Sequence, residues 1–177
     1  MAGASTIQED LMEIQNHPAG FQPVRRDRLR LETVMDSYKA KGKLSEPTVC
    51  QDCGAVYHAG RWQWIEKPKD AHQTTCPACH RMRDHFPAGY VTMSGEFLAK
   101  HEDEIMRLIK HRELQEKAEH PMQRIMNIEK TKQGTLVTTT DVHLARGIGE
   151  ALHHAYQGEL EFHFNKDQNL LRVNWRR

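Results

Sequence analysis

The sequence predicts an α+β fold in which a C-terminal antiparallel sheet carries one packed helix, with smaller modules before it. Two Cys-x-x-Cys pairs mark a separate block, helical spacing of apolar residues follows, and β-rich runs then flank one amphipathic helix. Helices and antiparallel strands in separate stretches are typical of the α+β class. We expect a basic, partly flexible N-terminal arm at 1–46, a zinc-ribbon-like block at 47–93, a helix at 94–120 and a ββαββ domain at 121–177.

The composition limits the size of the core. Of the 177 residues, 38% are hydrophobic and 28% are charged, and the mean hydropathy is −0.76. This supports one modest core or two very small ones, with polar segments between them.

No apolar run is long enough to span a membrane, and the N-terminus lacks the basic and apolar regions of a secretory signal. We therefore expect a cytoplasmic protein whose cysteines serve as metal ligands or catalysts.

The N-terminal arm carries a local excess of positive charge. Residues 24–43 hold seven Lys or Arg side chains and three Asp or Glu, whereas the whole chain has a net charge of +1. Two interpretations stay open, a solvated arm and an arm that becomes ordered on an anionic partner. Any affinity for nucleic acid must come from such local patches.

The four cysteines form two pairs with the spacing of zinc knuckles. Cys50 and Cys53 flank Gln-Asp, Cys76 and Cys79 flank Pro-Ala, and 22 residues separate the pairs. A Cys-x-x-Cys turn presents two thiolates to one metal, and two such turns on facing hairpins complete the tetrahedron that Zn²⁺ prefers. Gly54 follows the first pair, where a positive φ is useful. We predict one structural zinc, because four thiolates leave no open position for water.

Other interpretations of the second pair compete with zinc. Cys76-x-x-Cys79-His80 matches a c-type haem attachment motif, but haem leaves the first pair unexplained and requires export. A redox dithiol uses the same turn, yet the βαβ context of thioredoxin-type proteins is absent from the sequence. Zinc release under oxidation is the remaining alternative, and we expect His80 beside the site rather than in it.

Residues 94–119 have the periodicity of one long amphipathic helix. Ser94 can cap its first turn, and Pro121 ends it. We expect the preceding stretch, 86–95, to be irregular because it contains a Pro and a Gly. One face of the helix, at i, i+3 and i+4 steps, consists of Phe97, Leu98, His101, Ile105, Leu108, Ile109 and Arg112.

The C-terminal residues alternate as expected for strands around one helix. A Lys-Gln-Gly turn separates the first two β-rich runs, and Asn-Lys-Asp-Gln-Asn separates the last two. The helix between them can be capped by Thr139 or Thr140, and Gly158 ends it. We predict strands at 125–131, 135–140, 160–164 and 171–175, with the helix after the second strand.

Cations and tryptophans near these elements are candidate contacts to RNA. Base stacking on Trp and phosphate contacts from Arg and Lys are the usual interactions. For Trp62 and Trp64 a structural role competes, since a Trp can cover a small metal core. The candidates are Arg25, Arg26, Arg28, Arg30, Lys39, Lys41, Lys43, Arg61, Trp62, Trp64, Arg81, Arg83, Arg172, Arg176 and Arg177.

The sequence contains no catalytic constellation. It has no phosphate loop and no nucleophile elbow, and zinc would leave no cysteine free. We therefore predict a non-enzymatic protein without a small-molecule substrate or a membrane partner. A protein-interaction module or a zinc-based redox sensor with no RNA partner is the alternative.

Residues 48–177 resemble the zinc-binding ribosomal-subunit export adaptor family of archaea and eukaryotes, and more closely its short, single-zinc bacterial relatives. The resemblance lies in the two cysteine pairs and in 138–177, where a Thr-rich strand precedes a helix containing Ala-Arg-Gly-Ile-Gly and two closing strands. The additional cysteine pairs and export signals of larger members have no counterpart here. The resemblance implies ribosome association through the large subunit and its RNA, in an assembly, hibernation or stress role, without shuttling between compartments.

Overall fold

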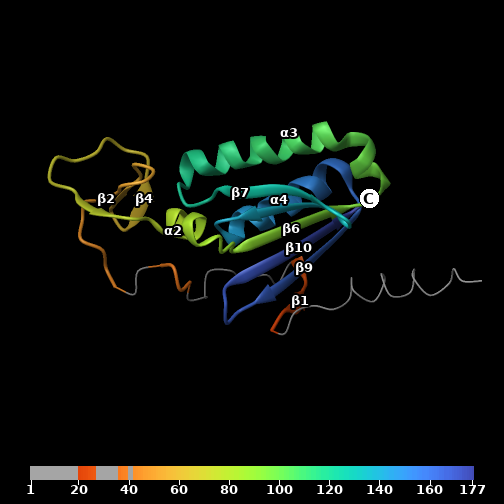
Figure 1. Cartoon of the computed structure of the whole chain (residues 1–177), viewed down its shortest axis with the longest axis horizontal. Helices are drawn as coiled ribbons and strands as arrows, with labels where there is room; N and C mark the ends of the chain where they lie inside the picture. The colour runs from red at the N-terminus through yellow and green to blue at the C-terminus, as the bar shows by residue number, and fades with distance from the viewer. Residues whose placement is uncertain (1–19, 27–35, 40–41) are drawn as a thin grey trace, which may run out of the picture.

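The computed structural model describes residues 20–26, 36–39 and 42–177, and within them it contains two sheets and helices that connect and cover them (Figure 1). The larger sheet has the strand order β1-β9-β10-β6-β8-β7, and the smaller has the order β4-β3-β2-β5. Strands of the larger sheet are β1 (Gln22–Val24), β6 (Gly89–Ser94), β7 (Ile125–Thr131), β8 (Gly134–Thr139), β9 (Glu159–Asn165) and β10 (Leu170–Arg176). Strands of the smaller sheet are β2 (Thr48–Cys50), β3 (Val56–His58), β4 (Arg61–Gln63) and β5 (His72–Thr74), and the helices are α2 (Pro77–Asp84), α3 (Glu96–Glu119) and α4 (Val142–Tyr156).

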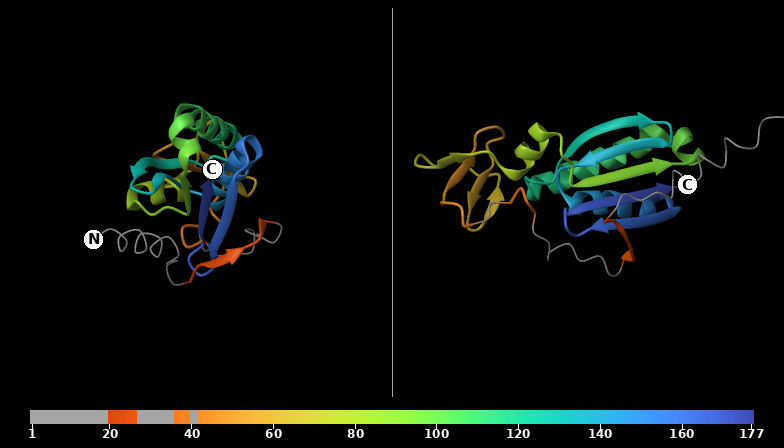
Figure 2. Two further views of the ribbon diagram at one scale, coloured as in Figure 1. Left: turned by 90° about the vertical axis from the view of Figure 1, so that its right-hand side faces the viewer. Right: turned by 60° about the horizontal axis from the view of Figure 1, so that its bottom comes forward.

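The α+β class, the long helix and the C-terminal strands with a packed helix are confirmed. The two predicted hairpins are present, because β7 pairs with β8 and β9 pairs with β10, both antiparallel. In the larger sheet α4 packs directly on β10 and β6, and α3 packs on α4. Figure 2 (right) shows both helices on the same side of the sheet, behind the strands.

The stretch that we expected to be irregular is a central strand. β6 lies between β10, to which it is parallel, and β8, to which it is antiparallel. Buried Val91 and Met93 alternate with half-buried Tyr90 and Thr92, which is the period-2 pattern of a strand. The prediction of an irregular segment was wrong because Gly89 served here as a strand residue. An added Cβ at this position would meet the Ala145 side chain at 2.4 Å, so the strand approaches α4 closely.

Both helix caps differ from the predicted ones. Ser94 ends β6, where its carbonyl accepts a hydrogen bond from Arg177 N–H, and α3 begins after Gly95 without a side-chain cap. The cap of α4 is Asp141, whose carboxylate accepts a bond from His143 N–H at 2.7 Å. A carboxylate at this position also matches the positive end of the helix dipole.

The core of the larger sheet lies between its strands and the two helices. Its buried residues form one continuous cluster. Among the described residues, no helix has the length and apolar composition of a membrane span. The largest fully buried side chains of this core are Met93, Ile105, Ile109, Leu144, Ile148, Leu152, Leu171 and Trp175.

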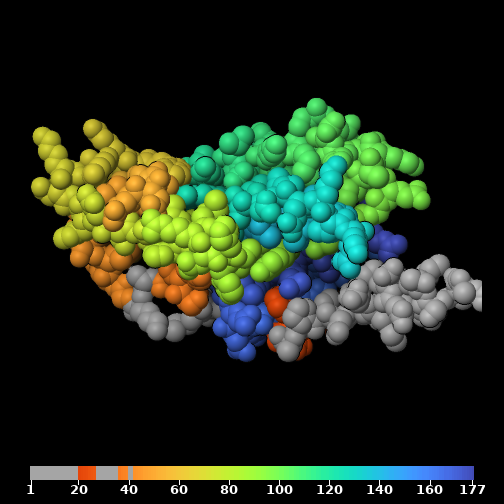
Figure 3. Space-filling view, in the orientation of Figure 1, coloured from red at the N-terminus to blue at the C-terminus, as the bar shows by residue number. Residues whose placement is uncertain are grey.

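The smaller sheet and α2 form a lobe at one end of the molecule, which we call the cysteine block (residues 42–88). It extends beyond the end of the larger sheet in the ribbon and space-filling views (Figure 3). Its strands have three residues each, and its buried cluster consists of cysteines and one alanine. This block has too little apolar material for a large hydrophobic core of its own.

Candidate metal centre and basic surfaces

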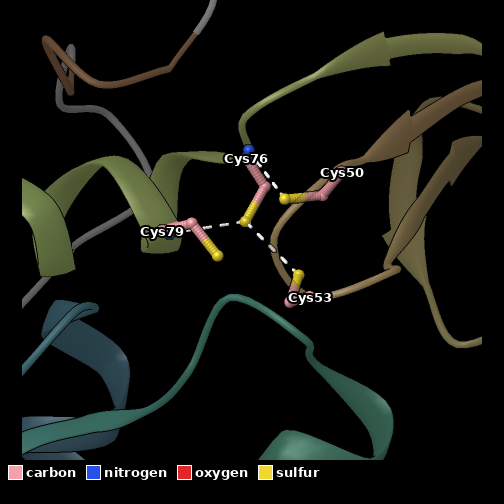
Figure 4. A group of neighbouring side chains, drawn as sticks. All are labelled: Cys50, Cys53, Cys76 and Cys79. Carbon is pink, nitrogen blue, oxygen red and sulfur yellow. Dashed lines mark hydrogen bonds between the residues drawn. The ribbon is translucent and has the colours of Figure 1, made fainter.

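The four cysteines converge at the junction between the smaller sheet and α2 (Figure 4). Cys50 ends β2, Cys53 lies in the turn after it, Cys76 caps α2 and Cys79 lies in the first turn of α2. Their Sγ atoms all lie within 4.8 Å of one another, and Cys53 is the one that is only half-buried. Thiolates around a tetrahedral zinc, with bonds of about 2.3 Å, are separated by about 3.8 Å. The predicted four-cysteine metal site is therefore confirmed as an arrangement that can hold a metal ion.

Backbone N–H groups point at the sulfurs, as knuckle geometry requires. Cys76 N–H donates to Cys50 Sγ at 3.2 Å, and Cys79 N–H donates to Cys76 Sγ at 3.4 Å. Gly54 has a φ of 78° and donates its N–H to Cys50 O, so the positive φ predicted there is observed. The two pairs do not lie on facing hairpins, however. The second pair lies at the N-terminus of α2, where the helix dipole stabilises thiolates.

Arg124, in the connection between α3 and β7, contacts three of the four cysteines. Its Nη2 donates to Cys53 Sγ at 3.1 Å, and its Nη1 donates to Cys79 Sγ at 3.4 Å. Nη2 also lies 3.9 Å from Cys76 Sγ, while Nε donates to Pro121 O at 2.7 Å. A zinc ion with four thiolates has a formal charge of −2, so one guanidinium offsets part of it. Arg124 was not among the predicted site residues.

The cysteine pKa values show how protons are distributed in the thiol cluster without a metal ion. The pKa of Cys53 is lowered to about 4, chiefly by its hydrogen bond with Cys76 and further by Arg124. The same bond, together with burial, raises the pKa of Cys76. Burial raises the pKa of Cys79 to about 11. Cys53 thus loses its proton more readily than Cys76 and Cys79, and a metal must displace the protons of those two thiols.

The two tryptophans stabilise the cysteine block and its contact with the larger sheet's helices. Trp62 packs against the cysteine cluster and lies edge-on to Tyr57, with ring centroids 5.5 Å apart. Trp64 donates its indole N–H to Lys117 O, near the end of α3, at 2.6 Å, and its ring lies 5.7 Å from Arg124 Cζ. These contacts support a structural role for both tryptophans, although Trp64 is still 40% exposed.

Arg81 lies in the interior, which corrects its prediction as a contact to RNA phosphate. Its side chain is 1% exposed, and its Nη2 donates to Asp36 Oδ1 at 2.8 Å. The guanidinium lies over the Tyr38 ring at 4.3 Å and near the Phe86 ring at 5.8 Å. Tyr38 also donates its hydroxyl to Asp84 at 2.9 Å. Arg81 thus fixes residues 36–39 on α2 and is not accessible to a phosphate in this structure.

Three more of the predicted cations are engaged within the protein. Arg172 lies between the rings of Phe21 and Tyr90, at 4.9 and 5.0 Å. Arg177 lies 4.2 Å from the Phe97 ring, and Arg83 forms an exposed ion pair with Asp52 at 2.6 Å. These positions contribute to packing or to surface ion pairs.

Within the described ranges, the remaining predicted cations do not form one continuous surface. Arg61 is exposed on β4 and Arg176 is exposed at the end of β10. In Figure 1, β4 and the C-terminus lie at opposite ends of the described part of the chain. In the N-terminal arm, the exposed cations of the described residues are Arg25, Arg26, Lys39 and Lys43, whereas Arg28, Arg30 and Lys41 lie outside the described residues.

No protein-family model, curated protein or solved structure matches the chain. The resemblance to the export adaptors therefore remains a prediction based on the cysteine pairs and the C-terminal motif.

Proposed function

We propose that the protein is a non-enzymatic, cytoplasmic zinc protein that binds ribosomal RNA on the large ribosomal subunit, as an assembly, hibernation or stress factor. Zinc is the metal that best suits four thiolates, because Cys₄ tetrahedral sites are typical of structural zinc. Arg124 and the N-terminus of α2 both favour thiolates here. The zinc ion has a structural role, and the RNA contacts come from elsewhere.

The distribution of charge carries the RNA proposal. Residues 24–43 have a balance of +4, from seven cations and three anions. The whole chain has 25 Lys or Arg and 24 Asp or Glu, so the rest of it holds 18 cations against 21 anions, a balance of −3. A polyanion would therefore be attracted by the arm and repelled by much of the remaining surface.

The structure supports this role by anchoring the described parts of the arm at two places. β1 pairs with β9 at the edge of the larger sheet, and residues 36–39 are held on α2 by Arg81. Arg25 and Arg26 follow β1 directly, and Lys39 follows Tyr38, so anchored backbone presents these exposed cations. Anchoring reduces the ordering cost when a partner binds.

Cofractionation with ribosomes on a gradient tests this function. We expect the protein in the large-subunit fractions at low salt and its release as salt rises, because phosphate contacts displace counterions. Reversing the charge of Arg25, Arg26 and Arg28 should abolish cofractionation. The matched control reverses three exposed cations outside the arm, Arg107, Lys110 and Lys132, and should bind as the wild type does.

Two results would contradict the proposal. Sedimentation only at the top of the gradient at every salt concentration would exclude ribosome binding. Equal losses in the arm variant and the control variant would show that net charge alone, and not the arm, drives the association.

A further inference from the structure

A groove between the edge strand β1 and helix α4 gathers three arginines around one glutamate. Arg25, Arg26, Arg146 and Glu150 line a pocket of about 610 Å³. An adjoining pocket of about 370 Å³ shares Arg25 and Arg26 and continues along β1 and β9. Arg146 was not among the predicted RNA contacts, and the groove brings it next to the arm.

Glu150 organises this cluster without neutralising it. Its Oε1 accepts a hydrogen bond from Arg146 Nε at 2.9 Å and lies 3.5 Å from Arg26 Nε. Both guanidinium groups therefore point at the same carboxylate oxygen. The described residues that line the pocket, three arginines and one glutamate, sum to a formal charge of +2, and guanidinium groups match the geometry of a phosphate group. The side chains of Arg146 and Glu150 are 32% and 29% exposed, so the pair is partly screened from solvent.

The adjoining pocket has a different chemistry. Its lining combines apolar side chains, Pro23, Val24, Leu160 and Phe162, with two histidines, His153 and His163, and with Glu161. Apolar and imidazole surfaces suit the sugar and base of a nucleotide, while the arginines suit its phosphate. The two pockets share Arg25 and Arg26, so a phosphate in the basic pocket and a nucleoside in the less polar pocket would lie side by side, as they do in one nucleotide unit.

We propose that this groove binds one nucleotide unit of RNA, with the phosphate at Arg25, Arg26 and Arg146 and the nucleoside in the adjoining pocket. The proposal deepens the proposed RNA binding and rests on it. It adds a defined subsite, formed by Arg146 and Glu150 of α4 together with the arm.

The test measures binding of a fluorescently labelled single-stranded oligoadenylate to the full, zinc-loaded chain over a series of salt concentrations. Arg146→Gln should weaken binding about tenfold, as expected for a lost hydrogen bond to a charged group. The slope of log affinity against log salt should fall by about 0.7, the value for one single-strand phosphate contact. The control, Arg107→Gln, makes the same charge change on α3, outside the groove, and should leave both quantities near wild type.

A second variant acts in the opposite direction. Glu150→Gln keeps the side-chain shape and removes its charge, so the pocket should bind RNA more tightly and with a steeper salt slope. If Arg146→Gln lowers the melting temperature, exposed Arg25→Gln provides the same test, because Arg25 lies on the surface of the arm. Adenosine monophosphate and inorganic pyrophosphate are measured in parallel by calorimetry.

The outcomes separate the subsite from RNA binding as a whole. RNA binding that falls equally in Arg146→Gln and Arg107→Gln, or that falls with Glu150→Gln, overturns the groove and leaves the proposed function standing. Absence of RNA binding, with adenosine monophosphate binding that depends on Arg146, overturns the RNA proposal and assigns the groove to a free nucleotide. Binding of neither ligand overturns both.

Discussion

The cysteine block and the larger sheet are two folded regions that are held together by different physical means. The larger sheet buries a continuous apolar cluster drawn from its central strands and from α3 and α4. The cysteine block buries Cys50, Cys76, Cys79 and Ala78 around what can be a metal site, and its strands are short. The larger sheet is stabilised by hydrophobic burial. We expect the folding of the cysteine block to depend on a bound metal ion.

The contact between the two regions involves both the cysteines of the block and residues next to the larger sheet. Arg124 reaches the cysteines from the sheet side, and Trp64 reaches Lys117 and Arg124 from the block side. A guanidinium that donates to thiolates is held by their negative charge, which a bound metal maintains. Loss of the metal should therefore affect the contact as well as the block, while the larger sheet stays folded.

The largest effect is expected for Cys76→Ser, which removes a ligand and the cap of α2. The cysteine block should unfold and lose zinc, because structural zinc supplies on the order of 10 kcal/mol of folding free energy in small modules. Amide exchange and metal analysis measure this. Met82→Ser, at an exposed position of the same helix, is the control and should retain one zinc per chain. A protected, folded block in Cys76→Ser would show that the cysteine block folds without an intact metal site.

The reverse experiment truncates the core of the larger sheet. Ile148 is fully buried in α4, so Ile148→Ala should cost about 2–5 kcal/mol of unfolding free energy. Denaturant unfolding measures the loss, and zinc content should stay at one per chain. If zinc were lost together with sheet stability, the two regions would be a single cooperative unit.

Arg124→Gln tests the contact between the cysteine block and the larger sheet. Removing the charged hydrogen bonds to Cys53 and Cys79 should cost about 1.5–3 kcal/mol, seen as weaker zinc binding in competition with a chelator. Arg124→Lys keeps the charge but not the two-pronged geometry, and should lie between the wild type and Arg124→Gln. Equal zinc affinity in all three proteins would show that Arg124 does not stabilise the bound metal.

The smallest effects distinguish two arginines on α2. Arg81→Met should cost about 1–3 kcal/mol, because Asp36 loses a partner in a largely buried pair. Arg83→Met breaks an ion pair whose arginine is 58% exposed, and should change stability by less than about 0.5 kcal/mol. Thermal unfolding compares the two variants. A larger loss for Arg83→Met would reverse the assignment of interior and surface positions.

These two arginines also show what sequence reasoning can and cannot reach. The cysteine site was predictable because its signal, two Cys-x-x-Cys pairs, lies in local spacing. Arg81 looked like a surface cation beside a knuckle, and its burial depends on Asp36, 45 positions away. Arg124 meets Cys53 across 71 positions and Cys79 across 45, and no local pattern marks it. The β6 strand was missed because Pro87 before the strand and Gly89, its first residue, outweighed a short alternation of buried and half-buried positions.

Hydrogen exchange of the full chain with zinc bound, and again after removal of zinc by a chelator, measures the metal dependence of each region separately. We predict that amides of the cysteine block, residues 42–88, lose their protection without zinc, while β6, β8, β10 and α4 keep theirs. Unchanged protection in the block after complete removal of zinc would contradict the account. Loss of protection throughout both regions would contradict it as well.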